Sequence, residues 1–207
     1  MKHFKLRTDL TAEFFGRTLF RIEATRDIEK FGVKKGDLGG YVESEENLSG
    51  DAWVSGNAQV YGDARVYGDA WVSGNAWVYG NAQVSGNARV YGIAQVYGDA
   101  QVYGNAWVYG IARVSGNAWV SGNAQVYGDQ IEKENDLINI TSNIGSYNIT
   151  ITPKHIKIGC QYHSKTAWFN FTDDEIVKMD GEKAVNWWKT WKPILQAICD
   201  GLKGKKE

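Results

Sequence analysis

The stretch VYGNAWVYGIARVSGNAWVSGNAQVYGD, from Val102 to Asp129, repeats one six-residue phrase with little variation. Its unit reads Gly-Asn/Asp-Ala-x-Val-Tyr/Ser, so Ala comes two residues before each Val, and Gly two residues before each Ala. Val recurs at every sixth position from Val54 to Val126, and the same register reaches back to Leu48 and Val42. The repeat therefore contains fifteen hexads, from about Gly39 to Tyr127, and is expected to end there because position 132 is Glu.

A period of six residues predicts short strands separated by bends. Ala and Val are two residues apart, so they share one face of an extended segment. Gly followed by Asn or Asp is typical of bends. A helix with 3.6 residues per turn cannot keep a six-residue repeat on one face. Each hexad is thus expected to bury its Ala and Val and to expose its Asn or Asp.

In this pattern the chain resembles the hexapeptide-repeat superfamily, in which an aliphatic residue is followed four places later by a small one. Val90 is followed in this way by Ala94, and Val96 by Ala100. The resemblance covers the fifteen hexads and implies a left-handed parallel β-helix with three hexads per coil, hence about five coils. The expected fold class is an all-β solenoid with an N-terminal β cap and a small α+β C-terminal domain.

The flanking segments define the expected domains, which are 1–38, 39–130 and 131–207. Residues 1–38 contain the alternating strand patterns KHFKL and TLFRIEA, and they are expected to cover the unpaired edge of the first coil. The segment from Lys34 to Val42, with Asn47-Leu48 after it, resembles the entry to the solenoid in uncharacterised hexapeptide-repeat proteins of phages and prophages. That resemblance implies a phage or prophage protein.

Residues 131–207 predict a small α+β domain. The patterns LINIT, YNITITP and HIKIGC predict strands, the last two joined at Pro153-Lys154. TDDE, Thr172 to Glu175, is a capping box that begins a helix, which Asp180-Gly181 should break. A second helix carries an apolar stripe, and Pro193 is expected to kink it near Lys189 to Lys192. The members of the stripe are Ala184, Trp188, Trp191, Leu195, Ile198 and Leu202.

The composition favours a protein of the host bacterium's cytoplasm. The formal net charge is −1, and the N-terminus has no apolar signal core. No run of residues approaches transmembrane length, and the two cysteines argue against a disulfide framework. Residues 51–130 carry three Arg against five Asp, so binding of long nucleic acid is not expected. No membrane partner is expected either.

Enzymes of the superfamily are usually acyltransferases, which need histidine and an inserted loop. The three histidines are His3, His155 and His163, none of which lies in the hexads, and the hexads carry no insertion. We therefore expect no catalytic residue, no metal and no cofactor. Cys160 and His163 have Cys-x-x-His spacing, but a metal site would need two more ligands, so a structural role is expected.

With three hexads per coil, residues 18 apart stack, and the variable positions fall on three faces. Face A carries Trp53, Trp71, Arg89, Trp107 and Gln125 before each Val, and Ser55, Ser73, Tyr91, Tyr109 and Tyr127 after it. Face B carries Gln59, Trp77, Gln95 and Arg113 beside Tyr61, Tyr79, Tyr97 and Ser115. Face C carries Arg65, Gln83, Gln101 and Trp119 beside Tyr67, Ser85, Tyr103 and Ser121.

Two features of this map point to an interaction surface. Arg89 lies between two tryptophans and is expected to stack on both rings. Ile93 and Ile111 replace the Asn or Asp of the bend at one corner and form an exposed apolar strip. Part of the aromatic pattern follows simply from strand preference and ladder stacking. The expected interface is Trp53, Trp71, Arg89, Tyr91, Ile93, Tyr97, Trp107, Tyr109 and Ile111, with Trp187 as a secondary candidate.

These observations lead to three functional hypotheses. The first is a non-enzymatic phage or prophage accessory protein that binds a host macromolecule, for example to inhibit host defence. It would also self-associate, with a trimer favoured because relatives commonly trimerise through flat solenoid faces. The second is a sugar- or nucleotide-binding protein that uses the aromatic ladder. The third is a hexapeptide acyltransferase.

Overall fold

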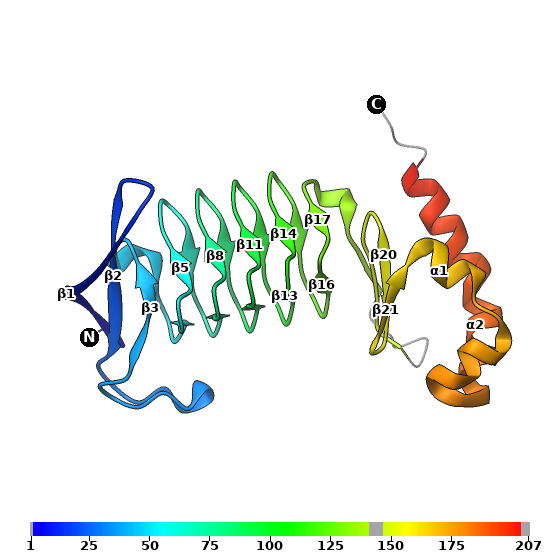
Figure 1. Cartoon of the computed structure of the whole chain (residues 1–207), viewed down its shortest axis with the longest axis horizontal. Coiled ribbons are helices and arrows are strands. Elements are labelled where there is room, and N and C mark those ends of the chain that lie inside the picture. Colours follow the sequence, from blue (N-terminus) through cyan, green and yellow to red (C-terminus); the bar gives the residue numbers. More distant parts are fainter. Residues whose placement is uncertain (1, 141–146, 204–207) are drawn as a thin grey trace. The chain divides into compact units, whose positions relative to one another are not determined.

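The computed structural model describes residues 2–140 and 147–203 (Figure 1). The chain divides into two compact units, Met1–Leu137 and Ile138–Glu207. The first unit is a parallel β-solenoid, and the second combines a small antiparallel sheet with helices.

The solenoid of the first unit has about five coils, as the repeat predicts. Each short strand pairs in parallel with the strand three hexads further on, for example Trp71 with Arg89 and Arg89 with Trp107. Pairing is the same for either sense of winding, so the left-handed sense stays a prediction. Face A consists of β4 (Trp53–Val54), β7 (Trp71–Val72), β10 (Arg89–Val90), β13 (Trp107–Tyr109) and β16 (Gln125–Tyr127).

The other two faces follow the predicted map as well. Face C consists of β6 (Arg65–Val66), β9 (Gln83–Val84), β12 (Gln101–Val102) and β15 (Trp119–Val120). Face B consists of β5 (Gln59–Val60), β8 (Trp77–Val78), β11 (Gln95–Val96), β14 (Arg113–Val114) and, at its end, β17 (Gln130–Ile131). The sequence map of the three faces is therefore confirmed.

Alanine and valine fill the interior of the coils. Every hexad Ala and Val from Ala52 to Val126 has an exposed fraction of 0%. The bend glycines from Gly50 to Gly128 all have φ between 58° and 77°, which favours glycine. They also stack closely, since a Cβ on Gly74 would lie 3.0 Å from the Gly92 carbonyl oxygen. The invariant letters of the hexad thus specify the core and the bends.

The N-terminal segment extends face B and covers the first coils. β1 (Phe4–Phe14) and β2 (Arg17–Ala24) form a hairpin, and β2 pairs antiparallel with β3 (Leu38–Val42). β3 in turn pairs in parallel with β5, so the hairpin continues the sheet beyond the first coil. Between β2 and β3 lies η1 (Glu29–Phe31). The centroid of its Phe31 ring is 5.3 Å from that of Trp71, and Lys30 Nζ is 2.8 Å from a carboxylate oxygen of Asp69.

The repeat extends beyond its expected end at Tyr127. Ile131 pairs with Val114, because one residue is missing from the bend and the chain regains the column despite Glu132. Leu137 packs against the same core. η3 (Glu134–Asp136) comes directly before Leu137, and η2 (Glu45–Asn47) comes directly before Leu48. The first and last coils therefore both have a 3-10 helix followed by a leucine.

The second unit contains a four-stranded antiparallel sheet and two helices. The strands are β18 (Ile138–Ile140), β19 (Ile149–Ile151), β20 (His155–Ile158) and β21 (Gln161–Ser164), and the helices are α1 (Lys165–Asn170) and α2 (Asp173–Lys203). The first three strands confirm the prediction as far as the described residues go, since Thr141 lies outside them. β21 and α1 were not predicted.

The long helix α2 confirms two predictions. Thr172 and Glu175 form the reciprocal capping box, and Asp180 and Gly181 leave helical angles. The backbone angles stay helical through Pro193, and the kink expected near Lys189 to Lys192 stays a prediction. Proline removes one hydrogen bond, whereas the stripe on both sides of it stays packed in the core of this unit.

Candidate functional site

Arg89 lies between two indole rings on face A. Its guanidinium carbon is 5.7 Å from the centroid of Trp71 and 5.5 Å from that of Trp107. The predicted cation–π sandwich is thereby confirmed. Arg89 is exposed, and within the described residues its guanidinium pairs with no carboxylate. The two rings therefore hold an exposed, planar charged group in place.

The N-terminal segment covers the first two residues of the predicted tryptophan ladder, Trp53 and Trp71. Trp53 has an exposed fraction of 2%, so its assignment to an exposed interface is wrong. The N-terminal segment folds back here, and His3 Nε2 donates a hydrogen bond of 2.7 Å to the Ala52 carbonyl. Trp71 is partly covered by Phe31, and its Nε1 donates to Ser55 Oγ at 2.9 Å. The open part of face A therefore begins at Arg89.

Ile93 and Ile111 form an exposed apolar ridge at the corner between faces A and B. Their exposed fractions are 54% and 61%, as the sequence predicted. The Ile93 amide donates to the Gly110 carbonyl at 2.9 Å, which places the two residues on adjacent coils. At the same corner in the two preceding coils, Asn57 donates to Asn75 at 3.3 Å, so the isoleucines interrupt a polar ladder.

Two stacked tyrosines adjoin these isoleucines on face A. The rings of Tyr91 and Tyr109 are 5.1 Å apart and inclined by 12°. Burial, and to a smaller extent the neighbouring tyrosine, raises the pKa of each hydroxyl, so both are protonated donors at neutral pH. We name the surface formed by Ile93, Ile111, Tyr91 and Tyr109 the isoleucine ridge.

Tyr97 lies apart from the isoleucine ridge. It belongs to a second ladder at the far edge of face B, where its ring is 5.0 Å from that of Tyr79. Arg113, in contrast, adjoins the ridge, because it pairs with Gln95 two residues after Ile111 and Ile93. Arg113 was not among the predicted site residues, although the stacking map placed it beside the isoleucines.

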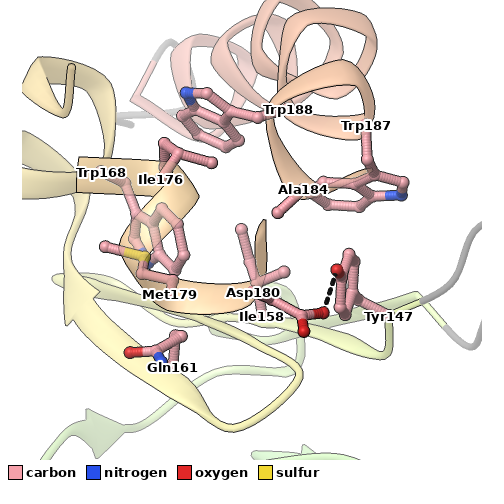
Figure 2. A pocket seen from close by; sticks show the side chains of 10 residues that line it. All are labelled: Tyr147, Ile158, Gln161, Trp168, Ile176, Met179, Asp180, Ala184, Trp187 and Trp188. Carbon is pink, nitrogen blue, oxygen red and sulfur yellow. Dashed lines mark hydrogen bonds between the residues drawn. The ribbon is translucent and has the colours of Figure 1, made fainter. Parts of the chain in front are cut away.

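The second unit contains a small apolar pocket (Figure 2). Its volume is about 30 Å³, which is the space of one water molecule and too small for an organic ligand. At its edge the Tyr147 hydroxyl donates to Asp180, and burial, followed by this bond, raises the pKa of Tyr147 to about 12. The pocket is lined by Tyr147, Ile158, Gln161, Trp168, Ile176, Met179, Asp180, Ala184, Trp187 and Trp188.

Trp187, the secondary interface candidate, is half-buried within its own unit. Its ring meets Tyr147 edge to face at 4.9 Å and stacks on Trp191 at 5.5 Å. Within the described residues its Nε1 is buried without a hydrogen-bond acceptor. Trp187 therefore packs within its own unit.

The Cys160 and His163 pair does not form a recognisable centre. Cys160 is an exposed free cysteine, whereas the His163 ring packs edge to face on Trp168 and Phe171, and burial lowers its pKa. Among residues 2–140 and 147–203, no group of three or more His, Cys, Asp or Glu side chains could hold a metal.

A larger hollow of about 310 Å³ lies between η2 and the hexad that contains Asp63. Its walls mix acidic and basic groups, and the Asn47 amide there is engaged with the carbonyls of Gly62 and Ala64, each at 2.9 Å. The lining residues are Ser44, Glu46, Asn47, Gly62, Asp63, Ala64 and Arg65.

Comparison with known proteins adds to the picture of the coils. A family model described as the YdcK beta solenoid repeat matches residues 58–74, 82–92, 94–110 and 112–128. No curated protein matches the chain. In the described part of the chain, no helix is long and apolar enough to cross a membrane. Together with the parallel coils, the matched repeats support assigning this chain to a repeat β-helix family.

Proposed function

We propose that this chain is a non-enzymatic binding module that docks a macromolecular partner on the isoleucine ridge. The observation that carries the proposal is the pair of exposed isoleucines at bend positions where the repeat uses Asn or Asp. Contiguous exposed apolar surface marks interaction sites more often than chance placement does. Covering the exposed half of each isoleucine is expected to contribute about 1 kcal/mol.

The rigidity of the solenoid suits this role. Val90, Ala94 and Val108 beneath the ridge are fully buried, and every coil is hydrogen-bonded to its neighbours. A ridge held on such a scaffold loses little conformational freedom on binding. The resemblance of Lys34–Val42 to phage and prophage proteins supports a host macromolecule as the partner, for instance a defence component met in the cytoplasm. A homotrimer formed through the same ridge is the alternative arrangement.

To test the proposal, both isoleucines are replaced by asparagine, which the repeat commonly has at this bend position. The variant Ile93→Asn/Ile111→Asn removes the apolar side chains and extends the ladder of Asn57 and Asn75. The matched control is Asn87→Ser/Asn105→Ser, which changes another corner of the same two coils. Mass by light scattering and capture of host proteins are measured for both variants.

Loss of self-association or of a captured partner is expected in the isoleucine variant and not in the control. If both variants behave like the unaltered protein in both measurements, the ridge is not an interaction surface. Thermal unfolding monitors the fold, which both variants should retain because the changed side chains are exposed.

A second candidate function is supported by the stack of Arg89 and Trp107. The half-buried indole of Trp107 beside a guanidinium suits stacking with the rings of sugars or nucleotides. Because Trp53 is buried, the part of this ladder that a ligand could reach is the part around Arg89 and Trp107. Calorimetry with glycan and nucleotide panels tests it, and heat that disappears in Trp107→Ala would establish it.

A further inference from the structure

We infer that the partner on the isoleucine ridge is an acidic protein segment, whose apolar side chains cover the isoleucines and whose carboxylates pair with Arg89 and Arg113. This inference rests on the proposed function and specifies the chemistry of the partner. Its basis is the position of the two arginines, neither of which forms an ion pair among the described residues.

The two cations flank the ridge on opposite sides. Arg113 adjoins Ile111 on face B, where it pairs with Gln95 of the preceding coil. Arg89 lies on face A, on the other side of Tyr91, whose ring is 6.3 Å from that of Trp107. An apolar surface bordered by cations fits a partner with apolar groups between acidic ones.

Neither arginine is neutralised by the described part of the chain. Arginines of the N-terminal segment have carboxylate partners, with Arg7 2.8 Å from Glu23 and Arg17 2.7 Å from Glu43. No such ion pair exists for Arg89 or Arg113 among the described residues. The planar guanidinium of Arg89 is already oriented by two rings, so a carboxylate could bind it bidentately at a small entropic cost.

The same charges argue against a two-fold dimer formed through the ridge. A two-fold interface brings the same patch of each copy together, so it would gather four arginines in one contact. Two acidic corner residues, Asp51 and Asp69, are already paired with Arg26 and Lys30 of the N-terminal segment. The hydroxyls of Tyr91 and Tyr109 add donors, which again fit an acceptor-rich partner.

A protein is favoured over a nucleic acid because the charge is local. Residues 51–130 carry three Arg and five Asp, so the solenoid offers no extended cationic track for a phosphate backbone. Two separated guanidinium groups beside an apolar ridge match individual carboxylates instead. An acidic amphipathic segment provides both kinds of group.

The experiment uses a display library of random linear peptides, selected on the immobilised full chain. We expect the selected peptides to combine Asp or Glu with large apolar residues. A synthetic copy of the dominant peptide is then titrated by fluorescence anisotropy at low and high salt. Arg89→Gln/Arg113→Gln should weaken its binding about ten-fold or more, and salt should weaken it as well.

Arg65→Gln is the matched control, because Arg65 is also an exposed solenoid arginine without an ion pair in the described chain, but lies on face C. Peptide binding should be unchanged in this control. Selected peptides without acidic residues, or equal binding to the double arginine variant, would overturn the inference. Binding of a single-stranded oligonucleotide that competes with the peptide would also overturn it, in favour of nucleic acid.

The isoleucine variant separates this inference from the proposed function. If Ile93→Asn/Ile111→Asn binds the selected peptide as well as the unaltered chain does, the ridge is not the docking surface and both proposals fail. If it loses the peptide while Arg89→Gln/Arg113→Gln retains it, the ridge stands and only the acidic partner is wrong. Unchanged thermal unfolding of each variant confirms that the fold is intact.

Discussion

Ile131 lies in register with Val114, although 17 residues separate the two, one fewer than the 18 between Val96 and Val114. The shortened bend lets an isoleucine take the place that Glu132 would otherwise occupy. Its side chain is fully buried, and Leu137 follows it against the same core. The last coil is therefore closed by a deletion of one residue.

Replacing Ile131 should destabilise this closing coil. Ile131→Ala removes a fully buried side chain, so the free energy of unfolding should fall by about 2–5 kcal/mol. Urea denaturation of the full chain measures the change. Ile111→Ala is the control, because Ile111 is 61% exposed and should cost no more than about 0.5 kcal/mol. Equal effects of the two changes would show that Ile131 is not part of the core.

The tip of the N-terminal hairpin should tolerate, and even favour, a substitution. Phe15 has φ of 47° and is 82% exposed, and with Gly16 it forms a two-residue turn that requires positive φ. Phe15→Gly should therefore raise the stability by up to about 1 kcal/mol. Phe14→Ala should lower it instead, because Phe14 packs on Trp77 at 5.0 Å. A loss of stability in Phe15→Gly, measured by urea denaturation, would contradict this.

His3 should make the stability of the N-terminal segment depend on pH. Burial lowers its pKa below the usual value of about 6.5, and its Nε2 donates to the Ala52 carbonyl. The unfolded chain therefore binds a proton more readily than the folded chain as the pH falls below about 6.5. The stability that His3 contributes is present at neutral pH and lost in acid.

Urea denaturation at about pH 7.5 and about pH 5.5 measures this linkage. The unaltered chain should lose more stability between the two values than His3→Gln does, because glutamine does not titrate and its amide can still donate. The same loss in both proteins would mean that another group is responsible.

Tyr147 should ionise later than an ordinary tyrosine. Burial, followed by the hydrogen bond to Asp180, raises its pKa to about 12. Asp180→Asn removes the carboxylate and should lower that pKa, while Tyr147→Phe identifies the signal in an alkaline ultraviolet titration. An unchanged late ionisation in Asp180→Asn would leave burial as the sole cause.

The solenoid was predictable because its period is exact for most of its length. Val and Ala at fixed positions specify which side chains point inward, and a period of 18 specifies which residues stack, so the exposure of Ile93 and the position of Arg89 followed directly. A fixed period cannot reveal a deletion, and for this reason Ile131 was missed.

Contacts between distant segments were the other source of error. The cover over Trp53 comes from His3, 50 residues earlier, and no local pattern reports it. In the second unit, α1 was missed because it has only six residues, Lys165–Asn170, and its Ser164 cap gives a weak signal. The pairing of Arg113 with Gln95 could have been found from the map, but arginine alone does not suggest an interface.

Because each coil consists of three similar hexads, the repeat also limits which insertions and deletions the solenoid can accept. Because successive hexads are nearly identical, unequal recombination could add or remove them in units of six residues. A gain of 18 residues would preserve every column and lengthen the solenoid by one strand spacing, about 4.8 Å. A gain of six between Ile93 and Ile111 would turn all later residues by one face and carry the second isoleucine to another corner. A single hexad therefore cannot be added between the two isoleucines without dividing the ridge.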